Sequence, residues 1–298
     1  MPQEIIGFIG VGLMGHGMAK NLVEKGFDLT IMGHRNRAPV ESLVGRGAKE
    51  ARTPAEVAAA SSIVHLCVTG SAQVEALCSG PDGLMAGAKP GSIIVDCSTS
   101  DPVSTKKLSA AFAERGVAFI DAPLSRTPKE AEAGTLDTMV GADEATFARV
   151  KPVFEAWAAK IVHVGPVGAG HTMKLINNFV AMGYGALYAE ALTLAAKAGL
   201  TPQTVDGVLR GSRMDCGFYQ TFMRWVLERD ENAHKFTLVN GFKDMRYLEN
   251  LADSVGLANP MGNAVKNAFA VAVGTGQGEK YVPMLSDVVA GLNGTKLA

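Results

Sequence analysis

A lysine and an asparagine stand four residues apart in the segment GAGHTMKLINNF at residues 168–179. The run that follows contains no proline before Pro202, and its apolar residues recur at spacings near three and four. This pattern predicts a helix over 170–198, and the recurring residues are Met173, Ile176, Val180, Leu187, Leu192 and Leu194. On such a helix, Lys174 and Asn178 project from one face about one turn apart.

This pair could act on an oxygen atom of a reactant. A lysine ammonium within hydrogen-bond reach can stabilise and protonate an oxygen on which negative charge develops. Asn178 can orient a reactant or the lysine without adding charge. The alternative is a solvated lysine followed by a surface or capping asparagine, and the spacing alone leaves both interpretations open.

The elements that must position this pair divide the chain into two halves. Up to residue 165, apolar runs that predict strands alternate with helical patterns. The predicted strands are 5–10, 29–32, 63–68, 93–97, 118–122, 138–141 and 161–164, and the helices are 13–25, 71–77, 103–115 and 144–158. After Val164 only helices are predicted: 170–198, 202–210, 217–228, 236–255 and 260–274. Strands that are apolar throughout indicate a mainly parallel sheet covered on both faces. We therefore expect an α/β domain at 1–165 and an all-α domain at 166–298 that includes a long helix at 169–198.

Composition narrows the class of protein. The 298 residues suit two domains at roughly 150 residues each. The net charge is −1, aromatic residues make up 6% and no basic run occurs, which argues against nucleic acid as a partner. Cys67, Cys78, Cys97 and Cys216 lack CxxC spacing and are expected to be thiols in a reducing compartment, and the scattered histidines suggest no metal site. No signal peptide fits the start and no uncharged apolar run approaches about 18 residues, so we expect a soluble, cytoplasmic protein with no membrane contact.

A glycine-rich turn follows the first predicted strand and opens the first helix. In Gly10-Val-Gly12-Leu-Met-Gly15, the first glycine allows a tight turn and the second lets the backbone approach a pyrophosphate. Gly15 permits close packing of helix and strand, and the helix N-terminus attracts the anion. The pattern predicts a dinucleotide site formed by Gly10, Gly12, Leu13, Met14 and Gly15.

The end of the second predicted strand bears on which dinucleotide binds. An NAD site usually has an acidic residue there, about 20 residues after the glycines, to hold the ribose 2′-hydroxyl. Here the position falls on Gly33, followed by His34, Arg35, Asn36 and Arg37. Arginines attract a 2′-phosphate, so we predict NADP, with NAD possible, and include His34 and Arg35 in the site. The alternative is that the arginines are exposed residues at a helix start.

With these features, the chain resembles the β-hydroxyacid dehydrogenases, the relatives of 3-hydroxyisobutyrate dehydrogenase and tartronate semialdehyde reductase. The resemblance covers essentially the whole chain and depends on four motifs in the family's order. They are GFIGVGLMGHGMAKNL at 7–22, DAPLSRTPKEAEAGTLDTMVG at 121–141, GAGHTMKLINNF at 168–179 and FKDM at 242–245. It implies a Rossmann domain, a long interdomain helix and a helical C-terminal domain that completes the cleft.

The resemblance also implies roles for individual residues. Lys174 resembles the catalytic lysine, Asn178 its partner, and Lys243 the lysine that closes over the cofactor. Hydride delivered to a carbonyl leaves negative charge on oxygen, which Lys174 would stabilise and protonate. In oxidation the neutral amine would take the hydroxyl proton, and burial beside a cationic nicotinamide should depress the pKa of the lysine. Further residues expected beside the cofactor are Thr99, Val68 and Thr69, although relatives often have Leu-Pro at the last two positions.

The sequence departs from the family where the substrate is expected. Most relatives have Ser-Gly-Gly after the fifth strand, and this chain has Ser125, Arg126 and Thr127. Residues 127–130 also predict a capping box with proline at the first helical position, so an arginine lies beside a helix N-terminus, which favours an anion. An arginine here resembles the sulfolactaldehyde reductase branch, whose substrate is a sulfonate. The alternative is that Arg126 turns outward or pairs with Glu130 or Glu132. Arg213 adds a second cation, and Phe218 and Tyr219 either shape the pocket or begin a helix.

These observations predict an NADP-preferring reductase of a small anionic aldehyde, either a semialdehyde acid or a sulfolactaldehyde-like sulfonate. Within enzymes, the alternative is an NAD-linked 3-hydroxyisobutyrate-type dehydrogenase. Imine reductases generally lack lysine at the position of Lys174, and 6-phosphogluconate dehydrogenases are much longer. The alternative that is not an enzyme is an NADP-binding sensor module. The alanine-rich long helix suits a subunit contact, and relatives form dimers and tetramers, so we expect a homodimer or homotetramer.

Overall fold

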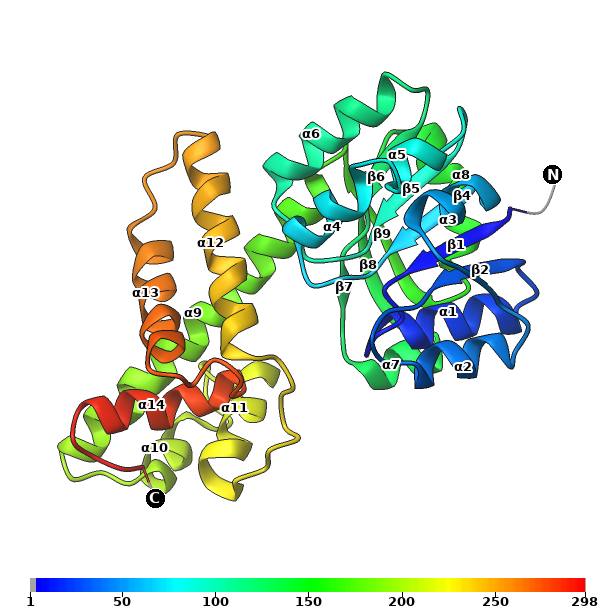
Figure 1. The fold of residues 1–298 in the computed structure, drawn as a ribbon. Helices are drawn as coiled ribbons and strands as arrows, with labels where there is room; N and C mark the ends of the chain where they lie inside the picture. Colours follow the sequence, from blue (N-terminus) through cyan, green and yellow to red (C-terminus); the bar gives the residue numbers. More distant parts are fainter. Residues whose placement is uncertain (1–3, 298) are drawn as a thin grey trace. The chain divides into compact units, whose positions relative to one another are not determined.

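The computed structural model describes residues 4–297. The chain forms two compact units, Met1–Lys174 and Leu175–Ala298, and the division falls inside the long helix α9 (Ala169–Lys197) (Figure 1). The predicted boundary at 165/166 assigns all of this helix to the second half and stays a prediction.

A single sheet organises the first unit. In the part of the chain that the structure describes it has nine strands, in the order β3-β2-β1-β4-β5-β6-β8-β7, with β9 paired to β8. Neighbours from β3 to β6 are parallel, β8 is antiparallel to β6 and β7, and β9 is parallel to β8. This confirms a mainly parallel sheet. The strands are β1 (Ile6–Ile9), β2 (Leu29–Met32), β3 (Lys49–Ala51), β4 (Ile63–Leu66), β5 (Ile93–Asp96), β6 (Ala118–Asp121), β7 (Leu124–Ser125), β8 (Leu136–Gly141) and β9 (Ala158–Gly165).

Helices cover both faces of this sheet. Successive residues of a strand point to opposite faces, and Phe8 and Val95 belong to one apolar cluster whereas Ile9 and Ile94 belong to another. The central strands β1, β4 and β5 are therefore buried along their whole length, because neither face meets water. The helices of this unit are α1 (Gly15–Glu24), α2 (Ala38–Val44), α3 (Pro54–Ala60), α4 (Ser71–Cys78), α5 (Leu84–Gly87), α6 (Pro102–Ala113), α7 (Pro128–Ala133) and α8 (Glu144–Phe154).

Two predicted elements end differently in the structure. The helix predicted at 144–158 stops at Phe154, and the strand predicted from residue 161 begins at Ala158. Pairing with β8 begins at Ala158. Hydrogen bonds to the sheet therefore make this residue part of a strand, although the local sequence favours a helix.

The second unit is a set of helices around its own core, which includes Leu175, Tyr219, Phe222, Phe269 and Leu285. The elements are the rest of α9, α10 (Pro202–Leu209), α11 (Gly217–Glu228), α12 (Leu238–Ser254), α13 (Pro260–Gly274), the 3-10 helix η1 (Val282–Met284) and α14 (Leu285–Leu292). Helices α12 and α13 lie side by side (Figure 1). The five helices predicted for this half are present, and η1 and α14 are additional.

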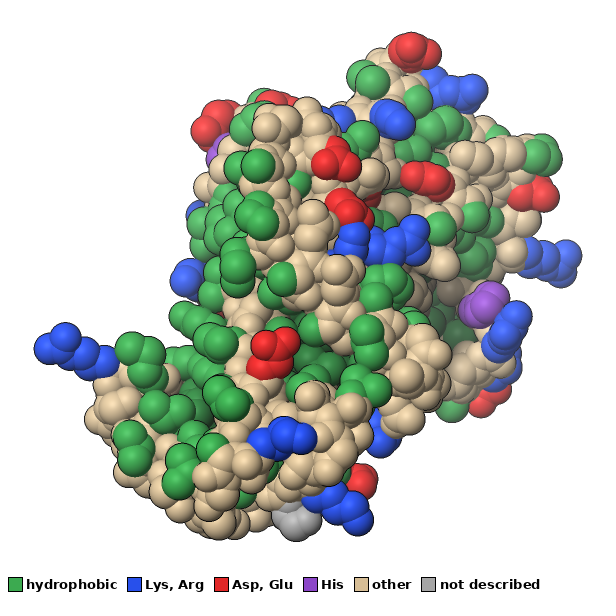
Figure 2. Space-filling model, turned by 90° about the vertical axis from the view of Figure 1, so that its left-hand side faces the viewer, with side chains coloured by type: hydrophobic (Ala, Val, Ile, Leu, Met, Phe, Trp, Pro, Cys, Tyr) green, Lys and Arg blue, Asp and Glu red, His purple; other side chains and the backbone are tan. Residues whose placement is uncertain are grey.

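Helix α9 has one buried and one exposed apolar face. Its buried face packs into the core, and its other face exposes Met173, Ile176, Val180, Tyr184, Leu187 and Leu194. Among the residues that the structure describes, α9 is the one helix long and apolar enough to cross a membrane by length and composition, with a mean hydropathy of 1.3 over 18 residues and 28% of them buried. This stretch was not predicted from the sequence, because polar residues such as Asn177 and Glu190 interrupt it. Figure 2 shows one face of the molecule, on which hydrophobic side chains are numerous and charged ones are spaced apart.

Candidate functional site

A cavity of about 630 Å³ opens at the end of β1 in the first unit. Six residues predicted to bind the cofactor line it: Gly10, Gly12, His34, Arg35, Val68 and Thr69. Its wall comes from the turn after β1, the segment after β2 and the loop from β4 to α4. Leu13, Met14, Gly15 and Thr99 are not among the residues that line it.

The glycines of the first turn differ in the space around them. Gly10 has a φ of +99°, and a Cβ added there would lie 2.2 Å from the Cys67 carbonyl oxygen. A Cβ on Gly15 would lie 2.0 Å from the Gly10 carbonyl oxygen, whereas Gly12 has no atom within 4 Å of that position. Gly10 and Gly15 are thus required by packing, and Gly12 faces open space where a pyrophosphate can approach.

The N-terminus of α1 suits an anion in the same way. Within residues 4–297, Met14 at its N-cap makes no side-chain capping hydrogen bond and the first turn has no acidic residue. The unpaired amides of a first turn attract negative charge. Both the open space and the helix end therefore fit a dinucleotide.

The segment after β2 contributes an imidazole and a guanidinium to the cavity wall. His34 and Arg35 are exposed and line the wall, whereas Arg37 bonds Glu50 on β3 through two hydrogen bonds of 2.7 and 2.8 Å. The hydrogen bond to Glu50 raises the pKa of Arg37, and the reciprocal bond lowers the pKa of Glu50. Of the two arginines that the sequence singled out, Arg35 is thus the one that lines the cavity.

The N-terminus of α9 is fixed by a buried carboxylate at the end of β6. Asp121 Oδ1 accepts the Gly168 amide at 2.7 Å, and Oδ2 accepts the His171 amide at 2.7 Å. Burial raises the pKa of Asp121, although His171 and the two amides act in the opposite direction. A Cβ on Gly170 would lie 2.4 Å from the Met139 carbonyl oxygen, so the helix can approach the sheet only with glycine there. Lys174, half-buried, follows three residues after His171.

A second buried carboxylate contacts α9 in the helical unit. Asp244, on α12, is fully buried, and its Oδ2 accepts the Asn178 side-chain amide at 2.6 Å. Lys243 Nζ lies 3.1 Å from Asp244 Oδ1 and 5.1 Å from the centre of the Tyr247 ring. Two predicted site residues, Asn178 and Lys243, are therefore joined through Asp244. Asp244 is not among the site residues predicted from the sequence, although it stands in the FKDM motif.

The end of β7 and the loop after it contain three of the four predicted substrate residues. Thr127 forms the predicted capping box of α7: Thr127 Oγ1 accepts the Lys129 amide at 3.3 Å, and Glu130 accepts the Thr127 amide at 3.1 Å. Ser125 is half-buried at the end of β7. Arg126 is exposed and has a φ of 85°, the left-handed region that favours glycine.

The side chain of Arg126 pairs with a carboxylate that was not anticipated. Its Nε lies 2.9 Å from Asp137 Oδ1 on β8, so neither Glu130 nor Glu132 is its ion-pair partner. The expected partners were near in sequence, whereas β7 and β8 are antiparallel neighbours that bring Asp137 opposite Ser125.

The remaining predicted residues belong to other segments of the chain. Thr99 is half-buried in the loop after β5, and Arg213 is exposed in the loop between α10 and α11. Phe218 is half-buried, and Tyr219 is buried with its hydroxyl 3.0 Å from Asp206. No group of three or more metal-binding side chains occurs among the residues described. All four cysteines are free.

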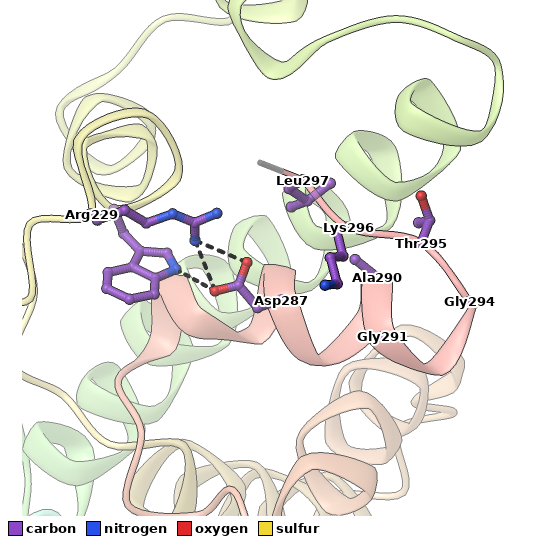
Figure 3. A pocket seen from close by; sticks show the side chains of 9 residues that line it. Arg229, Asp287, Ala290, Gly291, Gly294, Thr295, Lys296 and Leu297 are labelled. Carbon is purple, nitrogen blue, oxygen red and sulfur yellow. Dashed lines mark hydrogen bonds and ion pairs between the residues drawn. The ribbon is translucent and has the colours of Figure 1, made fainter.

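A separate pocket of about 840 Å³ lies in the helical unit. Figure 3 shows Arg229 and Asp287 turned toward each other in its lining, and the Arg229 guanidinium also lies 5.2 Å from the Trp225 ring. The Trp225 indole donates to Asp287 at 3.0 Å. These groups satisfy one another and join α11 to α14, and the pocket contains none of the predicted site residues.

Comparisons with known proteins identify the family. Residues 5–165 match the model described as the NAD binding domain of 6-phosphogluconate dehydrogenase. Residues 168–284 match the model described as NAD-binding of NADP-dependent 3-hydroxyisobutyrate dehydrogenase. The 2-(hydroxymethyl)glutarate dehydrogenase of Eubacterium barkeri is 41% identical over 209 residues, which cover 68% of this chain and 67% of that protein. The chain belongs to the β-hydroxyacid dehydrogenase family.

Other members of the family are similar to this chain over nearly its whole length. The NAD-dependent L-serine dehydrogenase of Pseudomonas aeruginosa is 32% identical over 92% of this chain and 94% of its own. The structure of Mycobacterium tuberculosis 3-hydroxyisobutyrate dehydrogenase with L-serine superposes with a TM-score of 0.85, at 26% identity, covering 96% of this chain and 99% of that one. This β-hydroxyacid dehydrogenase is therefore an NAD(P)-dependent oxidoreductase with a Rossmann domain and a helical C-terminal part. The predicted family, fold class and cofactor class are confirmed.

Proposed function

We propose that this β-hydroxyacid dehydrogenase reduces a small anionic aldehyde with a preference for NADPH, and that Lys174 acts as the general acid. The observation that carries the proposal is the fixed start of α9, where Asp121 holds the turn that precedes Lys174. A proton donor must be held at a defined place to act on a reacting oxygen.

The dinucleotide supplies the hydride when it is bound. Lys174 Nζ donates a proton to the carbonyl oxygen as negative charge develops there, and in oxidation the neutral amine accepts the hydroxyl proton. The Asn178 amide, held by Asp244, orients the reactant or the lysine without adding charge. Thr99 is proposed to face the nicotinamide and Lys243 to contact the cofactor.

The preference for NADP is supported by charge. His34 and Arg35 line the cavity, and none of its described lining residues is Asp or Glu. The Glu50 carboxylate, which could otherwise repel a phosphate, is neutralised by Arg37. An arginine that lines the wall favours the 2′-phosphate of NADP over a hydroxyl.

We propose that the substrate is an aldehyde with a carboxylate group rather than an aldehyde with a sulfonate group. Ser125 and Thr127 offer hydroxyl groups near a helix N-terminus, and Arg213 offers positive charge. Arg126 already pairs with the Asp137 carboxylate, so less of its positive charge is available to bind a sulfonate. The name of the Eubacterium relative, a dehydrogenase of 2-(hydroxymethyl)glutarate, agrees with a carboxylate substrate.

The test is initial-rate NADPH oxidation with three- and four-carbon aldehydes, in matched carboxylate and sulfonate versions, repeated with NADH. We expect faster turnover of a carboxylate aldehyde such as succinic or tartronate semialdehyde, and a lower KM for NADPH than for NADH. Lys174→Ala should abolish most turnover while NADPH binding, followed by fluorescence, stays intact. Near wild-type turnover of Lys174→Ala would refute the general-acid role. Faster turnover of the sulfonate aldehyde would instead indicate that Arg126 binds the anionic group of the substrate.

We also propose that the exposed apolar face of α9 is a contact between copies of this chain in a cytoplasmic homodimer or homotetramer. Ile176, Val180, Tyr184, Leu187 and Leu194 recur along this face at helical spacing, and a contiguous apolar face of this kind favours burial. Light scattering should give a mass at least twice that of the chain, and Leu187→Glu should lower it. A wild-type protein with the mass of one chain would contradict the proposal.

A further inference from the structure

The loops that follow β4 and β5 are tied to each other in the first unit. The Val68 amide donates to Ser98 Oγ at 3.0 Å, and Val68 lines the cofactor cavity. The Ser98 amide donates to Asp96 Oδ1 at 2.8 Å, and the Ser100 hydroxyl donates to Asp96 Oδ2 at 2.7 Å. Asp96 is 1% exposed, so the segment that includes Thr99 is anchored at both ends to a buried carboxylate.

His171 joins this loop to the first turn of α9. Its side chain is fully buried, and Nε2 lies 3.1 Å from the Ser98 carbonyl oxygen. A carbonyl only accepts, so Nε2 carries the hydrogen and donates it. Nδ1 pairs with Thr105 Oγ1 on α6 at 2.7 Å, and the His171 amide donates to Asp121. One residue of α9 thus contacts the ends of β5 and β6 and the helix α6.

We propose that His171 is a positioning residue for the reaction, holding Lys174 in register with the loop that presents Thr99. The inference depends on the proposed function, since it takes Lys174 as the proton donor. Lys174 is three residues beyond His171, hence on the neighbouring turn of the same face. The imidazole sets the place of that turn relative to Ser98, one residue from Thr99.

A histidine that only fills space would behave differently. His163 is a suitable comparison in the same unit, because its Nε2 also lies near a carbonyl oxygen, that of Ala142 at 2.8 Å, and its ring stacks on Phe147. His163 belongs to β9 and contacts neither Ser98 nor Asp121 through any hydrogen bond in the described chain. Replacing each histidine by leucine removes one ring and one such bond, but only His171→Leu releases the turn that carries Lys174.

The experiment compares His171→Leu, His171→Gln and Thr105→Val with the control His163→Leu. A displacement of about 1 Å at a reacting group can cost about 100-fold in rate, so we expect His171→Leu to lower kcat by about 10- to 100-fold. The cofactor dissociation constant should stay close to wild type. Thr105→Val keeps the shape of the side chain but removes the contact with His171 Nδ1 and the hydrogen bond to the Asp101 carbonyl oxygen, and it should lose less. His171→Gln should recover part of the rate because its amide can donate to Ser98.

Two readouts separate positioning from loss of structure. With NADPH deuterated at the transferred position, the isotope effect on kcat should rise in His171→Leu, because chemistry becomes slower than the other steps. A partly unfolded enzyme would lose rate with an unchanged isotope effect. Hydrogen exchange of the protein without cofactor should become faster in residues 168–174 of His171→Leu and stay unchanged there in His163→Leu.

The outcomes distinguish this inference from the proposed function. A wild-type enzyme that binds NADPH but turns over no aldehyde refutes the proposed function and the inference with it. An active wild type whose His171→Leu and Thr105→Val variants keep kcat within about twofold refutes the inference alone. An unchanged isotope effect together with unchanged exchange at 168–174 also overturns it.

Discussion

Two fully buried carboxylates bind the helix α9, one through backbone amides and the other through a side chain. Asp121, in the first unit, accepts backbone amides of Gly168 and His171. Asp244, in the helical unit, binds side chains, the Asn178 amide and the Lys243 ammonium. The first contact holds the backbone at the start of the helix. The second fixes particular functional groups. Loss of Asp121 should therefore lower stability together with activity, and loss of Asp244 should lower mainly activity.

The largest effect is expected for Asp121→Ala. Two buried amides lose a charged acceptor, and hydrogen bonds to charged groups contribute about 1.5–3 kcal/mol each, so the free energy of unfolding should fall by about 3 kcal/mol or more. Denaturant unfolding measures the change. The matched control is Asp143→Ala, because Asp143 caps α8 at the surface through the Thr146 amide at 2.9 Å, and a surface cap is worth about 1 kcal/mol. Equal losses would contradict the difference between the two caps.

Asp244→Asn should separate activity from stability. The amide keeps the size of the carboxylate but removes the charge facing Lys243, whose side chain is 21% exposed and can turn to water. We expect a stability loss of about 1–2 kcal/mol and a fall in kcat/KM of about 10- to 100-fold through displaced Asn178 and Lys243. The control is Glu249→Gln, also on α12, which breaks an ion pair with Lys266 on α13. It should leave kcat/KM unchanged. A large stability loss with normal kinetics would remove the distinction drawn between the two carboxylates.

Acid should affect the two units unequally. His65 lies in β4 between the rings of Phe8, Phe154 and Trp157, and burial lowers its pKa to about 3. Folding therefore favours the neutral ring, and this stability is fully present above pH about 6.5 and is lost on acidification toward pH 3, by about 1.4 kcal/mol per pH unit. His234 in the helical unit is shifted in the same direction, also by burial. His65→Phe should flatten the pH dependence of unfolding more than His234→Phe, and the reverse order would contradict the assignment.

The smallest effect is expected for Arg126→Gly, in the loop after β7. Glycine removes the strain of a left-handed φ, which costs an arginine about 1 kcal/mol, and loses an exposed ion pair with Asp137 worth about 0–1 kcal/mol. Stability should change by less than about 1 kcal/mol, in the stabilising direction. The KM for a carboxylate aldehyde should stay within about threefold, the range expected without a charge-assisted bond. A tenfold rise in KM would make Arg126 a substrate contact.

The sequence predicted the structure correctly where the type of a single residue determines the local conformation. Gly10 and Gly12 predicted the cavity, because only glycine allows the turn and the approach to a phosphate. Strands apolar on both faces predicted the parallel sheet. Short elements escaped prediction: β3 is three polar or small residues at a sheet edge, and β7 is two residues long.

What could not be predicted depends on contacts between distant segments. Asp121 and His171 are 50 residues apart, and Asn178 and Asp244 are 66 apart, so neither pair forms a spacing that a sequence pattern reveals. The partner of Arg126 was missed for the same reason, since strand pairing brings Asp137 to it. A buried acidic residue in a motif, such as Asp244 beside Lys243, was the available signal and was not used.

The cap formed by Asp121 also decides how the dinucleotide-binding half could be prepared on its own. A fragment cut after residue 165 ends before Gly168 and His171, so Asp121 would remain in an apolar interior with neither amide to bind. A fragment that runs on through the first turns of α9 keeps both amides. The autonomous folding unit of this half therefore includes the beginning of the long helix, and the shorter fragment should be insoluble.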